Sequence, residues 1–253
     1  MEDIVPGLIA DISASYRNRM ELDRRVLTVN RRIRDGTANL MDAHLYAERA
    51  GVNMSNAMLQ YITEENLPNG VLYYNIAERT VPTLLLEDYE AVNLTAADIQ
   101  RIMDRKAKIG LTASKADFPE ERIEGLVRKM TEPDLEFAQR LVWLKEPIVN
   151  NSEAFFDDFV KKNAEVRTQI GLKAIITRTV FPGCCSWCDE LAGTYEYGKE
   201  PADIYRRHEN CRCEVTYQTE RTSQDVWSKQ KWESTPEELE RRRNYTPKIK
   251  MRG

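Results

Sequence analysis

A cluster of thiols in the last third of this chain constrains its fold more than any other feature. The first pair has the spacing Cys185-Ser-Trp-Cys188, and a second group follows as His208-Glu-Asn-Cys211-Arg-Cys213. Zn²⁺ takes four sulfur or nitrogen ligands in a tetrahedron, and a C-x2-C pair supplies two of them from one turn of the chain. The residues between the two groups suffice for a hairpin or a short helix that returns the chain to the metal. The spacing therefore predicts a structural zinc site.

The segment offers more donors than a tetrahedral zinc needs, so the ligand set has alternatives. We predict that the zinc ligands are Cys185, Cys188, His208 and Cys211. Residues two apart on a strand face the same side, so Cys211 and Cys213 can both point at the metal, and Cys213 is the alternative to His208. In that arrangement His208 would donate a hydrogen bond to a ligand instead of binding the metal. Cys184 is the spare thiol, because its spacing to Cys188 is less common than C-x2-C.

A disulfide is the other use to which these cysteines can be put. Five cysteines leave one unpaired. The chain begins Met1-Glu2-Asp3, without the basic and apolar segments of a secretory signal peptide, so we expect assembly in a reducing cytoplasm. Reduced thiols favour metal binding, and a disulfide or inert thiols are the weaker alternatives.

The composition is that of a soluble chain long enough for one large domain or two small ones. The 253 residues carry a net charge of −4, which argues against a general nucleic-acid-binding protein. No apolar run approaches the length of a membrane span, so we expect no membrane partner. Basic residues gather near the end, at Arg241, Arg242, Arg243, Lys248, Lys250 and Arg252. Such an end can contact phosphate or an acidic neighbour, although most basic runs are solvated tails.

Residues 1–149 have the apolar spacing of a helical region. An apolar residue recurs at every fourth position at Ile4, Leu8, Ile12, Tyr16 and Met20. We predict one long helix that ends at Asp35-Gly36 and a second helix from Thr37 to about Ile62.

Further helices are predicted later in this region. Thr95 with Asp98 resembles a capping arrangement, which would begin a helix there. Pro119 and Pro133 each stand where a helix would begin. His44 is predicted to be a surface histidine rather than a ligand, because no metal-binding set surrounds it in the sequence.

Residues 150–220 are predicted to form a small α+β module in which an antiparallel sheet packs on a helix. Asn150 and Glu153 have the spacing of a cap for that helix. The predicted strands cover residues 172–181, 193–198 and 211–219. One helical turn is predicted from Pro201 to His208. The fold class is therefore α+β and mostly helical, with the sheet's loops meeting at the thiols.

Residues 221–253 are predicted to form a polar, extended arm. Trp227 and Trp232 stand alone among charged residues, and Thr235-Pro236-Glu237-Glu238 has the pattern that begins a short helix. Aromatic side chains on such a segment gain most by docking into a pocket, on this chain or on a neighbour.

The order of elements in residues 150–219 resembles the phage Mu F-like head morphogenesis family, also called minor capsid or minor head proteins. The resemblance rests on a helix, a strand with Arg178-Thr179, the C-x2-C pair, an aromatic hairpin and the ending His208-Glu209-Asn210-Cys211-Arg212-Cys213. The family usually has proline after the histidine, where this chain has Glu209. That departure leaves the pattern of ligands intact.

The resemblance implies a virion structural protein and no enzyme. Members act inside the phage head near the portal, in head assembly or DNA ejection, after synthesis in the cytoplasm of the bacterial host. The implied partners are the portal or major capsid protein, with packaged DNA as a further partner of the basic C-terminus. The alternative is a zinc-containing nuclease or other DNA-processing enzyme, but such an enzyme needs a general base beside any structural zinc ligands. Only His44 remains for that role if His208 binds zinc.

Overall fold

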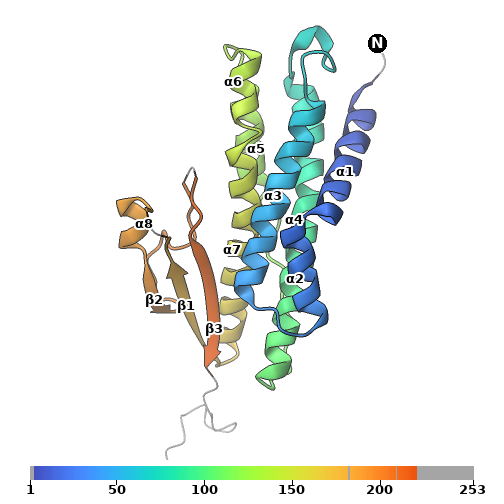
Figure 1. Ribbon diagram of the computed structural model, residues 1–253. Helices are drawn as coiled ribbons and strands as arrows, with labels where there is room; N and C mark the ends of the chain where they lie inside the picture. The colour runs from blue at the N-terminus through green and yellow to red at the C-terminus, as the bar shows by residue number, and fades with distance from the viewer. Residues whose placement is uncertain (1–2, 182, 209, 221–253) are drawn as a thin grey trace, which may run out of the picture.

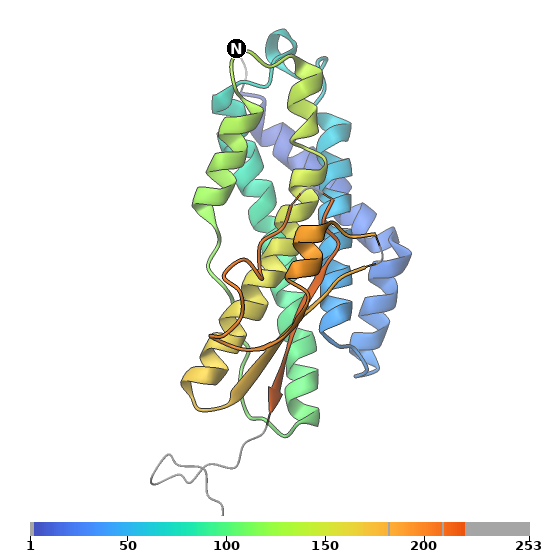
Figure 2. The same cartoon turned by 90° about the vertical axis from the view of Figure 1, so that its left-hand side faces the viewer.

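The computed structural model describes residues 3–181, 183–208 and 210–220. In these ranges the chain is mostly helical and carries a three-stranded antiparallel sheet, which confirms the predicted fold class. Figures 1 and 2 show the sheet on one side of the helical bundle, against α7. The arm that was predicted for residues 221–253, with its helix, its two tryptophans and its basic end, lies outside the described residues.

Helical elements make up most of the described chain. They are α1 (Val5–Leu22), α2 (Arg24–Arg34), α3 (Leu40–Tyr61), η1 (Pro68–Gly70), α4 (Tyr74–Lys106), α5 (Glu120–Met130), α6 (Phe137–Val142), α7 (Glu146–Gln169) and α8 (Ser186–Glu190). None of the helices in the described ranges is both long and apolar enough to cross a lipid bilayer.

The predicted long first helix is wrong, because Asp23 divides it into α1 and α2. The Asp23 side chain accepts hydrogen bonds from the backbone N–H groups of Arg25 and Val26, which caps α2. Arg49 and Asn53 on α3 bind the same carboxylate from the side, at 2.8 and 3.1 Å. The break is therefore fixed by contacts with α3 that the apolar spacing does not reveal.

Two predicted helix starts are also wrong. Thr95 and Asp98 lie inside α4, which runs without interruption past them and past Pro82. Asn150 and Glu153 lie inside α7, which begins at Glu146 with proline in its first turn. In both cases a polar residue that resembles a cap is instead part of a longer helix, whose packing overrides the local signal.

The helix starts predicted from proline are closer to the structure. α5 begins directly after Pro119, as predicted. α6 begins at Phe137, a few residues after Pro133, where Glu136 and Gln139 form a capping box. The second predicted helix is α3, which begins after Asn39 rather than at Thr37, because Asn39 and Asp42 cap each other's backbone.

The sheet has the order β2-β1-β3, with every neighbouring pair antiparallel. Its strands are β1 (Lys173–Thr179), β2 (Gly193–Glu196) and β3 (Glu214–Glu220). β1 and β2 fall within the segments predicted for them, and β3 begins within its predicted segment and ends one residue after it. Ala174, Ile176 and Arg178 alternate along the buried face of β1, which packs on α7. The segment from Pro201 to His208, predicted as one helical turn, contains no helix. Residues 202–205 form turns, in which the N–H group of Ile204 donates to the carbonyl of Pro201.

One apolar core runs from α1 to β3. α7 lies at its centre, because α7 packs on α3 and α4 with one side and on β1 and β3 with another. The predicted boundary at residue 150 falls inside α7. The division into a helical region at 1–149 and a module at 150–220 stays a prediction about folding units.

Candidate metal centre

Five side chains gather at one end of the sheet as candidate metal ligands. Cys185 precedes α8, Cys188 lies within α8, and His208 with Cys211 and Cys213 lies on the segment that leads into β3. They form two overlapping groups of three, and within each group all donor atoms lie within 4.8 Å of one another. One group is Cys185, Cys188 and His208, and the other is Cys188, Cys211 and Cys213. Cys188 belongs to both groups.

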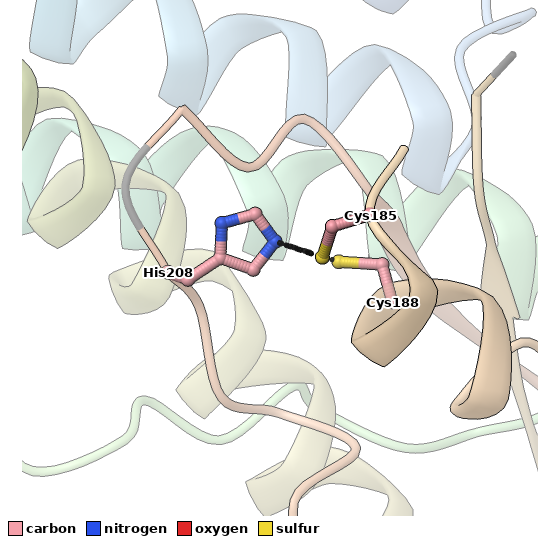
Figure 3. Close-up of side chains that lie close together, drawn as sticks. All are labelled: Cys185, Cys188 and His208. Carbon is pink, nitrogen blue, oxygen red and sulfur yellow. Dashed lines mark hydrogen bonds between the residues drawn. The ribbon is translucent and has the colours of Figure 1, made fainter. Parts of the chain in front are cut away.

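The spacing of the donors is that of a metal site. The Nε2 atom of His208 lies 3.1 Å from the sulfur of Cys185 and 3.0 Å from that of Cys188, and Figure 3 shows the ring directed at both sulfurs. The sulfurs of Cys188 and Cys211 are 3.8 Å apart. A tetrahedral zinc with bonds of about 2.3 Å to sulfur and 2.0 Å to nitrogen holds two sulfurs ~3.8 Å apart and a sulfur and a nitrogen ~3.5 Å apart. The sulfur pair matches this, and the imidazole needs to withdraw by about half an ångström.

Cys185 lies where the chain favours its thiolate. It occupies the N-cap position of α8 with an extended backbone. The backbone N–H groups of Cys188 and Trp187 donate to its sulfur, which lowers the pKa of Cys185. A C-x2-C pair around a helix start therefore makes one of its two thiols easier to deprotonate.

The buried thiols behave in the opposite way. Burial raises the pKa of Cys188 to about 12 and also raises the pKa of Cys213. Without a metal these thiols keep their protons, and a metal ion would displace them on binding. Metal binding at this site is therefore expected to be proton-coupled.

Arg178 places a buried positive charge against the sulfurs. Its side chain comes from β1 and is almost fully buried, and one guanidinium nitrogen lies 3.7 Å from the sulfurs of both Cys188 and Cys211. The other nitrogen donates to the carbonyl oxygens of Ile204 and Arg206. In the described part of the chain no carboxylate forms an ion pair with Arg178. A buried cation needs nearby negative charge, and thiolates that bind a metal would supply it.

The structure brings the predicted ligands together, but not as one group of four. Cys185, Cys188 and His208 form one group, whereas Cys211 joins Cys188 and its alternative Cys213 in the other. Cys184, the predicted spare, belongs to neither group and is half-buried beside them. All five cysteines are free thiols. These residues can bind a metal, and the choice of four ligands among the five stays a prediction.

His44 is not the surface histidine that the sequence predicted. It is buried, and its Nε2 atom lies 3.1 Å from Arg207 and 3.5 Å from Glu153. Burial, together with the charges of Arg207 and Arg212, holds the pKa of His44 well below its usual value, so the ring is neutral. The prediction failed because these neighbours are more than a hundred residues away in sequence.

Sequence reasoning also missed the parts that Arg178 and Arg207 play around the centre. Arg178 could have been found, because it falls on the same side of β1 as the buried Ala174 and Ile176. Arg207 carried no such signal, since its partners lie on other elements. Comparison of the chain with protein-family models, with curated proteins and with solved structures finds no match in any of the three.

Proposed function

We propose that this protein is a phage minor capsid or head morphogenesis protein, in which a structural zinc centre fixes the end of a small sheet. The observation that carries the proposal is the order of elements around the centre. A long helix, α7, leads into β1 with Arg178-Thr179, then the C-x2-C pair at α8, then β2, and then His208-x-Asn210-Cys211-Arg212-Cys213. This is the order that resembles the Mu F-like head proteins, and its cysteines and histidine meet at one place.

The donors favour zinc over other metals. Four thiols and one imidazole are soft or borderline ligands, which zinc takes in closed tetrahedral sites. Hard cations such as Mg²⁺ and Ca²⁺ need oxygen ligands, and no carboxylate belongs to either group of donors in the described residues.

A structural role fits the site better than catalysis. A catalytic zinc keeps one position open for water or substrate, whereas five protein donors compete here for four positions. A nuclease would also need a general base near the metal. Of the chain's two histidines, His208 lies among the ligands and His44 is neutral, buried and next to Arg207. The nuclease alternative would require His208 to leave the metal to Cys213 and act with Asn210.

The proposed place of action is the phage head, near the portal, after synthesis in the host cytoplasm. Portal and major capsid proteins are the proposed partners, and packaged DNA is a further one for the basic residues beyond 240. Mass spectrometry of purified proheads and virions tests this: the protein is expected in one or both, in few copies. Its absence from both particles would remove the proposal.

The zinc centre has its own test, which is independent of the particle. Purified protein is expected to hold one zinc per chain and to show no metal-dependent cleavage of DNA. Comparing His208→Ala with Cys213→Ser then identifies the fourth ligand, because loss of a true ligand weakens zinc binding far more than loss of a neighbour. DNA cleavage that disappears in a His208→Ala protein with its zinc retained would favour the nuclease.

A further inference from the structure

One face of α7 carries a row of polar side chains directed at the segment that holds the metal ligands. The row is Glu146, Asn150, Glu153 and Asp157. Steps of four, three and four residues place these side chains on one face of the helix. The ligand segment crosses the row so that Arg212 meets Glu146 at one end and Arg207 meets Asp157 at the other. Between them, Asn150 donates from its side-chain amide to the carbonyl oxygen of His208, at 3.2 Å.

Arg207 makes the most buried of these contacts. Its Nε and Nη2 atoms donate to the two oxygens of Asp157, at 2.5 and 2.9 Å. The exposed fractions of the two side chains are 4% and 1%. A planar fork of this kind fixes the orientation of the guanidinium as well as its distance, which a lysine would not do.

Arg212 makes the matching contact at the other end of the row. Its two terminal nitrogens donate to the two oxygens of Glu146, at 2.6 and 3.0 Å. Its side chain is 36% exposed, so this pair is weaker than the buried one. In the sequence, Arg212 lies between Cys211 and Cys213, and Arg207 directly precedes His208. Each arginine is therefore adjacent to a candidate metal ligand.

Glu153 lies between the two arginines and depends on both. Its carboxylate is fully buried, and it lies 3.4 Å from Arg207, 3.5 Å from Arg212 and 3.5 Å from His44. Neither oxygen accepts a well-formed hydrogen bond. A buried carboxylate of this kind is tolerated only while cations stay beside it. Displacement of the ligand segment would leave the Glu153 carboxylate buried and unpaired, which would destabilise the fold.

We propose that Arg207 and Arg212 are positioning residues that couple the metal centre to α7. The polar row on α7 holds the ligand segment in its binding geometry, and a bound metal in turn holds both arginines over the buried carboxylates. The inference rests on the proposed metal binding. Coupling between two equilibria is reciprocal, so α7 strengthens metal binding by the same factor by which the metal stabilises the packing of α7.

A simpler interpretation is that these ion pairs stabilise the fold and leave the metal unaffected. The two interpretations differ in one measurable quantity, which is metal affinity in a protein that remains folded. Partners that orient metal ligands from behind change affinity by about 10- to 100-fold when they are removed. A purely structural ion pair would leave it within about twofold.

The decisive comparison uses two adjacent arginines. Arg207→Gln removes the buried fork. Arg206→Gln is the matched control, because the Arg206 side chain is 73% exposed and its one ion pair among the described residues is with nearby Asp203. We expect zinc affinity, measured by competition with a chromophoric chelator, to fall about 10- to 100-fold in Arg207→Gln and to stay within about twofold in Arg206→Gln. The absorption of bound Co²⁺ should change in Arg207→Gln alone, because its ligands are no longer held in one geometry.

Arg212→Gln keeps the test valid if the loss of Arg207 unfolds the protein. Its partner Glu146 is partly exposed and tolerates being alone, and its other neighbour Glu153 keeps Arg207 beside it. A smaller loss of affinity is expected, in the same direction. In the wild-type protein, removal of zinc by a chelator should speed hydrogen exchange in residues 146–157 of α7. In either variant the effect of zinc on this exchange should be smaller, by the same factor by which the variant's zinc affinity is reduced.

Two results would overturn the coupling. One is a folded Arg207→Gln or Arg212→Gln protein that binds zinc like the wild type, and the other is an α7 whose exchange does not change when zinc leaves. A wild-type protein that binds no metal is a different result: it overturns the proposed zinc centre, and with it this inference.

Discussion

The helical bundle and the metal end of this molecule are stabilised by different means. The bundle buries large apolar side chains along its whole length, among them Met54 on α3, Leu84 on α4 and Phe159 on α7, all fully inaccessible to solvent. At the metal end the separate buried cluster consists of Cys188, Cys211 and Cys213. Burial of hydrocarbon side chains can stabilise the first region, whereas under the proposed function a metal bound by the thiols stabilises the second.

Buried charged side chains occur in both regions, but with different neighbours. In the bundle, Asp88 accepts hydrogen bonds from the hydroxyls of Tyr16 and Ser152, so neutral donors satisfy it. Near the candidate metal ligands, the buried Arg207 pairs with the buried carboxylate of Asp157, and Arg178 lies against the sulfurs of Cys188 and Cys211. Arg167 also forms a buried ion pair with Asp104 inside the bundle, and Gln100 donates to the same carboxylate. Both regions therefore contain polar networks, and the metal end differs in that its buried charges lie beside candidate metal ligands.

Loss of the metal is expected to give the largest effect, and to destabilise the region around the candidate ligands while the bundle stays folded. Cys188→Ser removes the thiol shared by both donor groups, so zinc should be lost. Structural zinc contributes on the order of 10 kcal/mol to small zinc-dependent folds. We expect hydrogen exchange and limited proteolysis to show opening of residues 180–215, with zinc content falling to zero.

Cys184→Ser is the control for that change. Cys184 is the neighbouring thiol that belongs to neither donor group. Its replacement should leave zinc content and the exchange of residues 180–215 unchanged. Equal zinc loss in both variants would show that the ligand set includes Cys184 and that the predicted choice between the two thiols is wrong.

A cavity in the bundle should give the next largest effect and leave the metal in place. Leu84→Ala deletes a fully buried side chain on α4, which is expected to lower the free energy of unfolding by about 2–5 kcal/mol. Leu94→Ala, on the same helix but 56% exposed, should cost less than about 0.5 kcal/mol. Denaturant unfolding measures both, and one zinc per chain should remain in each. Zinc loss in Leu84→Ala would show that the two regions do not differ in the way proposed.

The sequence predicted the parts of this molecule whose signals are local. The C-x2-C pair, the three strands and the helix after Pro119 depend on spacing and on turn residues within a few positions. The division between α1 and α2 was missed because Asp23 is fixed by Arg49 and Asn53, which come from another helix.

The surroundings of the metal were missed for the same physical reason. The residues next to His44 in the sequence resemble those around a surface histidine. Arg207, which contacts His44 in the folded protein, comes 163 positions later in the chain. The choice between His208 and Cys213 likewise depends on how the ligand segment crosses α7, which spacing does not encode. The spacing of apolar residues indicates which side of a helix or strand is buried. It does not indicate which side chains from distant parts of the chain will pack against that side.

The pH dependence of stability should report on the buried carboxyl group of Asp88 in the bundle. Burial raises the pKa of Asp88 to about 6 from an ordinary value of 3.8. The folded protein therefore binds this proton more tightly than the unfolded chain does, and the stability it contributes is present below about pH 4 and lost as the pH rises through 6. The loss amounts to about 3 kcal/mol at most.

Asp88→Asn tests this without the other titrating groups. The difference in unfolding free energy between wild type and Asp88→Asn should change between pH 4 and 6 and be constant above 7. Asp98→Asn, at a half-exposed position on the same helix, is the matched control for replacing a carboxyl group by an amide. A pH-independent difference for Asp88→Asn would contradict the raised pKa of Asp88.

The smallest expected effect is at the first turn of α3, where the two regions meet. The Asn39 side chain accepts from the backbone N–H groups of Met41 and Asp42, at 2.9 and 3.3 Å, and Asp42 accepts in return from the backbone of Asn39. Asn39→Ala should cost about 1 kcal/mol of unfolding free energy, and Asn39→Asp, which keeps an acceptor, should cost less.

His44 lies one turn further along α3 and contacts Arg207. If metal and bundle are coupled through α7 rather than through this end of α3, zinc affinity should stay within about twofold in Asn39→Ala. A tenfold loss of affinity would move the coupling from the carboxylates of α7 to the histidine of α3.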